Sequence, residues 1–184
     1  MKPVERRLAA ILVADMEEYS RLMHEDERGT VSEWQNTREE VIKPTLESHA
    51  GKILKNTGDG FVAEFSAVSG AVECAVAMQT SLVERNNDRP EGRHLKFRMG
   101  INLGEITIDE DDFYGDGVNV AARLEGLSEA PGICISSHVY DQVRNKVTFT
   151  FEDAGDTFVK NIDDPIRVYR VLCESPVSES ASED

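Results

Sequence analysis

The chain has 184 residues, of which 40% are hydrophobic and 30% charged, and this composition indicates a globular domain with a substantial core. Its formal net charge of −15 at pH 7 argues against nucleic-acid binding through the phosphates, because such binding needs a basic face. No apolar run reaches the roughly 18 residues of a membrane-spanning helix, and the three cysteines lack metal-ligand spacing. We therefore expect a cytoplasmic protein without membrane insertion.

The first predicted element is a strand over residues 7–15, RLAAILVAD. Its continuous apolar run is typical of a central strand that is buried on both faces. Helical periodicity follows. We expect this helical segment to break near Gly29, to restart at a capping box formed by Thr30 and Glu33, and to kink at Pro44.

The segment NTGDGFVAEF raises the question of what Asp59 does between two glycines. Residues 52–57 and 61–65 predict two strands, and Gly58 and Gly60 allow a tight hairpin turn between them. On this stretch alone, Asp59 can be a solvated carboxylate at a corner or a ligand at the lip of a sheet. The order of the other elements distinguishes the two interpretations.

The order of the predicted elements along the chain indicates the type of sheet. In chain order we expect a helix over 67–86, strands over 95–102 and 104–109 that meet near Gly104, a helix over 116–127, a strand over 132–136, a helix over 137–143, and strands near 148–152 and 167–172. The first six elements run β-α-β-β-α-β. This order predicts an α+β fold with a ferredoxin-like βαββαβ sheet, its helices on one face, and additional C-terminal α/β elements.

This arrangement brings two carboxylates together. The first strand lies beside the hairpin, so its C-terminal end and the hairpin turn are expected to be neighbours. Asp15 ends that strand, and Asp59 occupies that turn. Oxygen ligands without histidine or cysteine suit Mg²⁺ or Mn²⁺. The sequence therefore predicts a metal site at Asp15 and Asp59.

The segment DDFYGDGVNVAARLE has the acids and glycines of a calcium loop but not its spacing. A loop that starts at Asp109 puts Phe113 at a ligand position, and one that starts at Asp112 puts Arg123 where a glutamate should close it. Asn119 and Arg123 are four residues apart and share one helix face. From the residues alone, they can be an exposed polar pair or part of a site.

Four segments, LVADMEEYSRLM, KNTGDGFVAEF, FRMGINLGE and DDFYGDGVNVAARLE, resemble in order the motifs of the class III nucleotide cyclases, the adenylate/guanylate cyclase catalytic domain. The resemblance covers about residues 7–172 and implies a catalytic domain over 1–173 with the class III cyclase fold. Residues 174–184, with the sequence ESPVSESASED, lie outside this domain and are expected to be an acidic disordered tail or a linker.

The resemblance implies a reaction and its residues. In the family, the ribose 3′-hydroxyl of a nucleoside triphosphate attacks the α-phosphate and pyrophosphate leaves, with the help of two Mg²⁺ or Mn²⁺ ions. Asp15 and Asp59 match the metal aspartates, and the backbone carbonyl of Met16 matches a further ligand. Asn119 matches the residue that orients the ribose, and Arg123 matches the one that stabilises charge on the α-phosphate.

Lys55 and Asp112 match the two positions that select the base in this family, although Lys55 alone would be an ordinary exposed strand lysine. A lysine donor facing N1 and an aspartate acceptor facing the 6-amino group complement adenine, whereas guanine reverses both polarities. ATP and cyclic AMP are therefore the expected substrate and product. Lys160 matches a late lysine of the family that contacts the terminal phosphates.

The resemblance also implies an assembly. The metal aspartates and the other residues of a site come from opposite partners of a head-to-tail dimer in this family, so one chain with both sets implies a homodimer. A sensor or effector domain outside this chain is a further expected partner. Glu18 departs from the usual glycine of the family, which puts the turnover rate in doubt. The alternative is a catalytically weak or silent cyclase-like domain that binds nucleotide or dimerises to regulate another module.

Overall fold

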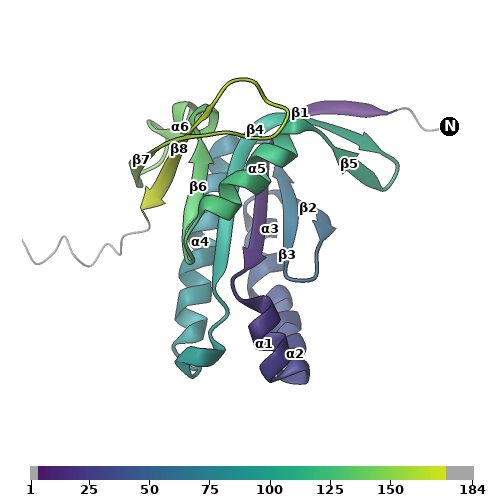
Figure 1. Cartoon of the computed structure of the whole chain (residues 1–184), viewed down its shortest axis with the longest axis vertical. Coiled ribbons are helices and arrows are strands. Elements are labelled where there is room, and N and C mark those ends of the chain that lie inside the picture. Colours follow the sequence, from purple (N-terminus) through teal and green to yellow (C-terminus); the bar gives the residue numbers. More distant parts are fainter. Residues whose placement is uncertain (1–3, 173–184) are drawn as a thin grey trace, which may run out of the picture.

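A mixed eight-stranded sheet organises residues 4–172, which are the residues described in this computed structural model (Figure 1). The strand order is β2-β3-β1-β4-β6-β8-β7, and β5 pairs with β4 outside this path. The strands are β1 (Glu5–Met16), β2 (Gly51–Asn56), β3 (Gly60–Phe65), β4 (Phe97–Asp109), β5 (Asp112–Tyr114), β6 (Ile133–Ser136), β7 (Thr150–Thr157) and β8 (Ile166–Leu172). The predicted tail over 174–184 lies outside the described residues.

Six α-helices and two short irregular turns complete the described part of the chain. They are α1 (Tyr19–Glu25), α2 (Glu27–Thr37), the π-helical turn η1 (Arg38–Ile42), α3 (Lys43–Ser48), α4 (Val68–Asn86), the 3₁₀ turn η2 (Glu91–Arg93), α5 (Asp116–Leu127) and α6 (Ser137–Val143). Among the described residues, no helix combines the length and the apolar character needed to cross a membrane.

The ferredoxin-like prediction is confirmed by the order β2-β3-β1-β4, in which β1 is antiparallel to both neighbours. Both faces of β1 are buried, as its apolar run predicts. Ala10 and Leu12 join the core beneath α2, α3 and α4, while Ala9 and Ile11 pack with Ala121 of α5. The additional helix α5 thus covers the face of the sheet opposite to the other helices (Figure 1).

Two local predictions about the first helical segment are wrong. The break falls at Asp26, whose Oδ1 accepts a hydrogen bond from the Gly29 N–H at 3.0 Å and caps α2. Thr30 is not a cap, because its buried hydroxyl donates to the Leu22 carbonyl at 2.9 Å. The interruption expected at Pro44 takes the form of η1, because proline has no N–H to continue the α-helical pattern.

The prediction of two strands that meet near Gly104 is also wrong, since β4 continues through it and pairs with β1 along its whole length. Gly104 instead allows α5 to approach, because a Cβ there would lie 2.9 Å from the Cα of Gly117. Gly100 has the same role, since its Cβ would lie 2.3 Å from the Glu125 nitrogen. The Asn102 side chain donates to the Gly117 carbonyl at 3.2 Å. Through these contacts, α5 packs directly against the backbone of β4.

We predict opposite effects for two glycine-to-alanine changes. Gly100→Ala should lower the free energy of unfolding by about 1–3 kcal/mol, because the added methyl pushes α5 off the sheet. The matched control Gly126→Ala lies in α5 with nothing within 4 Å of the added methyl, and it should raise stability by up to about 1 kcal/mol through helix propensity. Urea unfolding measures both. Equal effects of the two changes would contradict the direct packing of α5 against β4.

Candidate active site

Asp15 and Asp59 lie at the same end of the sheet, where β1 meets the turn between β2 and β3. In the register of β1 on β3, Asp15 lies opposite Gly60. The Met16 N–H donates to the Asp59 carbonyl at 2.8 Å, which ties the turn to the end of β1. A side chain at Gly60 could not be accommodated, since its Cβ would lie 1.8 Å from the Ala14 carbonyl oxygen. The close approach of the two segments therefore depends on this glycine.

Arg98 of β4 holds the carboxylate of Asp15 through two hydrogen bonds. Its Nε donates to Asp15 Oδ1 at 3.0 Å and its Nη2 donates to Oδ2 at 2.9 Å. The two residues face each other across the β1–β4 ladder. This pairing raises the pKa of Arg98. Sequence reasoning did not find Arg98, although a single cation within the apolar strand FRMGI was a usable signal.

Glu125 is a third carboxyl group at this end of the sheet, and sequence reasoning missed it. It is on the buried face of α5, its side chain is 8% exposed, and its Oε2 is 4.0 Å from Arg98 Nη2. Burial, hydrogen bonding with Asp15 and repulsion from Asp15 and Asp59 raise the pKa of Glu125 to about 9, against the attraction of Arg98. At neutral pH, Glu125 is therefore a protonated carboxyl beside Asp15.

The donor set at this end of the sheet suits a hard divalent cation. Asp15 and Asp59 offer carboxylate oxygens, and the guanidinium of Arg98 already places positive charge on both oxygens of Asp15. Within the described residues, no three or more His, Cys, Asp or Glu side chains form a metal centre of their own. A metal bound here would need further oxygen ligands, such as the predicted carbonyl of Met16 and oxygens of a substrate.

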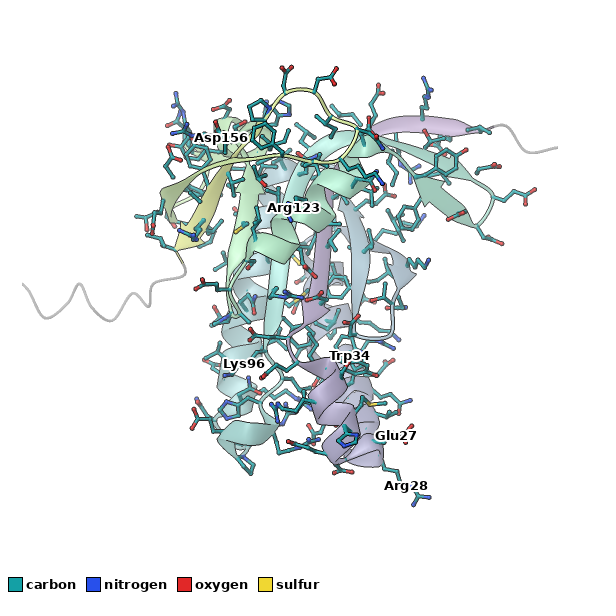
Figure 2. All side chains as sticks on the ribbon, in the orientation of Figure 1. Glu27, Arg28, Trp34, Lys96, Arg123 and Asp156 are labelled. Atoms are coloured by element: carbon teal, nitrogen blue, oxygen red, sulfur yellow. The ribbon has the colours of Figure 1, made fainter. Side chains whose placement is uncertain are left out.

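Asn119 and Arg123 are both exposed residues of α5, and Figure 2 labels Arg123. Arg123 Nε donates to Thr157 Oγ1 at 3.4 Å, and the Asn119 side chain has no hydrogen bond with any described residue. Positions 123 and 125 are roughly 200° apart around a helix, so a helix that turns Glu125 toward Asp15 turns Arg123 away from it. Within one chain, the structure does not bring this pair to the two aspartates.

A β-bulge determines the face of the sheet on which Lys55 lies. The register between β2 and β3 shifts between Ile53 and Lys55, so that Lys55 lies opposite Val62. Cross-strand partners point to the same face, and Val62 packs in the cluster that also holds Ala121 of α5. Lys55 is therefore on the α5 side of the sheet, where it is exposed and makes no hydrogen bond or ion pair with the described residues.

Asp112 begins the short strand β5, and its Oδ1 accepts a hydrogen bond from the Phe113 N–H at 2.9 Å. The chain neighbours of three predicted site residues share one hydrophobic cluster, since Leu54, Phe113 and Val118 all pack against it. Lys55, Asp112 and Asn119 directly adjoin those positions. The three residues are thus connected through their chain neighbours to one hydrophobic cluster, although the structure records no contact among them.

Lys160 is exposed in the loop between β7 and β8. Its neighbour Val159 is buried and packs with Val120 and Leu124 of α5. This contact holds the loop against the helix that carries Asn119 and Arg123. Among the described residues, the Lys160 side chain has no hydrogen bond or ion pair.

The backbone at Glu18 has the conformation that suits the glycine which the resemblance implies for this position. Glu18 has φ 57° and ψ 30°, the left-handed conformation that glycine adopts without cost and that other residues adopt at roughly 1 kcal/mol or more. Its carboxylate is paired with Arg21 at 3.4 Å, on an exposed part of α1. The departure from glycine therefore keeps the backbone conformation, and the added charge is partly neutralised by Arg21.

Comparison with known proteins supports the same assignment of fold. Residues 3–172 match the family described as the adenylate and guanylate cyclase catalytic domain. A Rhizobium meliloti (strain 1021) protein named "Putative adenylate cyclase 3" is 43% identical over 166 residues, which are 90% of this chain and 28% of that protein. This chain thus spans less than a third of the length of that relative.

Two crystal structures superpose closely on the chain. The adenylate/guanylate cyclase/hydrolase from Silicibacter pomeroyi has a TM-score of 0.86 and 42% identity, with 93% of this chain and 99% of that chain covered. The adenylyl cyclase CyaB from P. aeruginosa has a TM-score of 0.83 and 26% identity, with 95% and 98% covered. These matches confirm the predicted α+β fold.

The raised pKa of Glu125 predicts a pH-dependent gain in stability for Glu125→Gln. The pKa of this carboxyl rises from 4.5 to about 9 on folding, so it stabilises the fold only while protonated, and this stability is lost as pH rises toward 9. Glutamine cannot ionise and still offers an N–H to Asp15. In metal-free buffer, the thermal midpoint of Glu125→Gln minus that of wild type should increase as the pH rises from about 5 to about 9.

Circular dichroism melts across this pH range measure the effect. Glu129→Gln, which removes an exposed carboxylate a few residues later, controls for the loss of one negative charge. A difference between Glu125→Gln and wild type that does not vary with pH would show that Glu125 is ionised in the folded protein.

Proposed function

The chain belongs to the adenylate and guanylate cyclase catalytic domain family, and from this premise we propose that it is an adenylate cyclase that converts ATP into 3′,5′-cyclic AMP and pyrophosphate. The observation that carries the proposal is the convergence of Asp15 and Asp59 at one end of the sheet. Two relatives in the comparison carry adenylate or adenylyl cyclase in their names.

Asp15, Asp59 and the Met16 carbonyl are the proposed ligands of two Mg²⁺ or Mn²⁺ ions. When bound, such ions activate the attacking hydroxyl and neutralise charge on the triphosphate. Arg98 competes for the same oxygens, because it already occupies both oxygens of Asp15. Once displaced, its planar guanidinium remains at this end of the sheet as a donor suited to phosphate oxygens.

The choice of ATP over GTP rests on Lys55 and Asp112. Both side chains are exposed, and each adjoins a residue that packs against the same hydrophobic cluster. The lysine ammonium offers a donor to adenine N1, and the aspartate offers an acceptor to the 6-amino group. Guanine would face each group with the wrong polarity, and mispaired polar groups in a pocket exclude an analogue strongly.

Asn119 and Arg123 are the proposed catalytic residues of the exposed face of α5. Asn119 orients the ribose so that its 3′-hydroxyl faces the α-phosphate. Arg123 donates to the oxygens of the α-phosphate, where negative charge grows in the transition state. Lys160, held beside α5 by the packing of Val159, contacts the terminal phosphates.

The proposed site needs two copies of the chain. One face of α5 turns Glu125 to the aspartates of its own chain, so the opposite face with Asn119 and Arg123 is free for the aspartates of another copy. A head-to-tail homodimer satisfies both sets and contains two equivalent sites. The acidic surface is compatible with an anionic substrate, because metal ions and a few cations hold the triphosphate.

Glu18 favours a second candidate, a catalytically weak or silent cyclase domain that regulates another module. A carboxylate stands where the family usually has glycine, close to the end of β1. Its pairing with Arg21 favours the active enzyme, as does the presence of the six side chains Asp15, Lys55, Asp59, Asp112, Asn119 and Arg123.

We predict that the purified protein forms cyclic AMP from ATP in the presence of Mn²⁺ and forms less cyclic GMP from GTP. The double variant Lys55→Glu/Asp112→Asn offers an acceptor to guanine N1–H and an amide donor to O6. It should shift the ATP/GTP preference toward GTP by at least about tenfold. Product formation is measured by chromatography of both cyclic nucleotides.

The control for this experiment is Lys52→Glu, which repeats the charge change of Lys55→Glu at an exposed position of the same strand and should leave the preference unchanged. Absence of both products from folded wild-type protein would favour the silent domain. A double variant with unchanged preference would show that these two residues do not read the base.

We also predict that two inactive variants complement each other. Asp59→Ala and Arg123→Ala chains, mixed equally, should recover roughly a quarter of wild-type activity, because half of the dimers are mixed and each mixed dimer keeps one whole site. A mixture of Asp15→Ala with Asp59→Ala should stay inactive, since both sites of every mixed dimer lack an aspartate. No recovery in the first mixture, with mixed dimers demonstrated, would mean that the site is not shared.

A further inference from the structure

The turn that presents Asp59 is held by few bonds. Thr57 and Gly58 are exposed, and nothing lies within 4 Å of the position where a Gly58 Cβ would be. Within the turn, the Thr57 N–H donates to the Gly60 carbonyl at 3.0 Å. The Thr57 hydroxyl contacts Asp59 Oδ1 only at 3.5 Å. The position of the Asp59 carboxylate therefore depends on what holds the backbone of the turn from outside.

Two hydrogen bonds hold this backbone from outside the hairpin. One is the bond from the Met16 N–H to the Asp59 carbonyl at 2.8 Å. The other comes from a helix, since Trp34 of α2 donates its indole N–H to the Gly58 carbonyl at 3.0 Å. In the described part of the chain, this is the one side-chain hydrogen bond from outside the hairpin to residues 57–59. The indole thus fixes the peptide directly before Asp59.

Trp34 is rigid enough to hold another group. It is 4% exposed and lies where α2 meets the end of the sheet (Figure 2). Its ring packs against Phe97, with 5.3 Å between the centroids, and the Arg38 guanidinium lies 4.5 Å from the ring centroid. Phe97 directly precedes Arg98, the residue that binds Asp15. The indole thus contacts Gly58, which directly precedes Asp59, and Phe97, which lies opposite Met16 in the β1–β4 register.

We propose that Trp34 is a positioning residue of the metal site, which acts by holding the Gly58 carbonyl so that Asp59 is presented toward Asp15. The inference rests on the proposed function, because it takes Asp59 as a metal ligand. Trp34 touches no reacting atom. Its apolar packing stabilises the core, and its N–H orders the turn, so the two roles can be separated by removing the N–H alone.

The N–H can be removed with little change of shape. Trp34 is the only tryptophan in the chain, so growth on a benzothiophene analogue of tryptophan replaces this one ring by an isostere that has sulfur in place of N–H. Gly58 is an exposed residue, so water can replace the indole at its carbonyl and the fold should stay intact. Trp34→Phe is the second variant, because it keeps an aromatic ring against Phe97 and also lacks the N–H.

The test measures Mn²⁺ affinity by electron paramagnetic resonance of free Mn²⁺, with and without an unreactive α,β-methylene analogue of ATP. We expect both Trp34 replacements to bind Mn²⁺ about three- to tenfold more weakly than wild type, which is the range for the loss of one hydrogen bond. In the activity assay, saturating Mn²⁺ should restore most of the maximal rate, because the chemistry is intact.

Two control variants separate the outcomes. Leu82→Ala removes core packing in α4 but no hydrogen bond to the turn, and it should lower the thermal midpoint without changing Mn²⁺ affinity. Asp59→Ala should abolish the tight Mn²⁺ site. If wild type binds Mn²⁺ in an Asp59-dependent way and both Trp34 replacements bind equally well, the positioning role is overturned while the metal site stands. If Asp59→Ala binds like wild type, the metal assignment fails, and the inference fails with it.

Discussion

The antiparallel register of β1 between β3 and β4 is the constraint on which the rest of the site depends. It places Asp15 opposite Gly60 on one side and opposite Arg98 on the other. A slip of one residue would turn Asp15 to the other face of the sheet. The register is specified by the apolar residues that β1 buries on both faces and by Gly60, where the Ala14 carbonyl leaves no room for a side chain. The contacts that set the register of β1 thus also position the proposed metal ligand Asp15.

Under the proposed function, the way α5 packs on the sheet explains why the site is shared between two chains. Its close contact with Gly100 of β4 fixes the rotation of the helix, and this rotation buries Glu125 near Asp15. The same rotation exposes Asn119 and Arg123. Under the proposed function, one chain carries two half-sites that face different directions, and a head-to-tail dimer would complete both. The electrostatic arrangement supports this proposal, since Arg98 pairs with Asp15 and burial raises the pKa of Glu125, so that both reduce the negative charge around Asp15.

Much of this architecture could be predicted from the sequence because the signals were local. The apolar run of β1 and the patterns of α5 and α6 gave these elements within two residues of their bounds, and element order placed Asp15 near Asp59. Contacts between residues on different strands or helices could not be predicted, because no pattern in the neighbouring sequence indicates which residues meet. Arg98 and Asp15 are 83 residues apart, and the burial of Glu125 depends on how α5 is seated. Gly104 was wrongly predicted as the junction of two strands, because the contact that explains this glycine, the approach of Gly117, comes from another element. The hydrogen bond from Trp34 to Gly58 also had no sequence signal, because the two residues are 24 positions apart and meet only in the folded chain.

The central claim is that Asp15 and Asp59 of one chain hold the metal ions while Asn119 and Arg123 of another chain meet the nucleotide. Anomalous diffraction at the manganese edge, from crystals grown with Mn²⁺ and an unreactive ATP analogue, tests it most directly. The account predicts anomalous peaks between the carboxylates of Asp15 and Asp59, with Arg98 moved off Asp15 and the second copy's Arg123 at the α-phosphate. Peaks bound elsewhere, or a nucleotide contacted by Arg123 and both aspartates of a single chain, would contradict it.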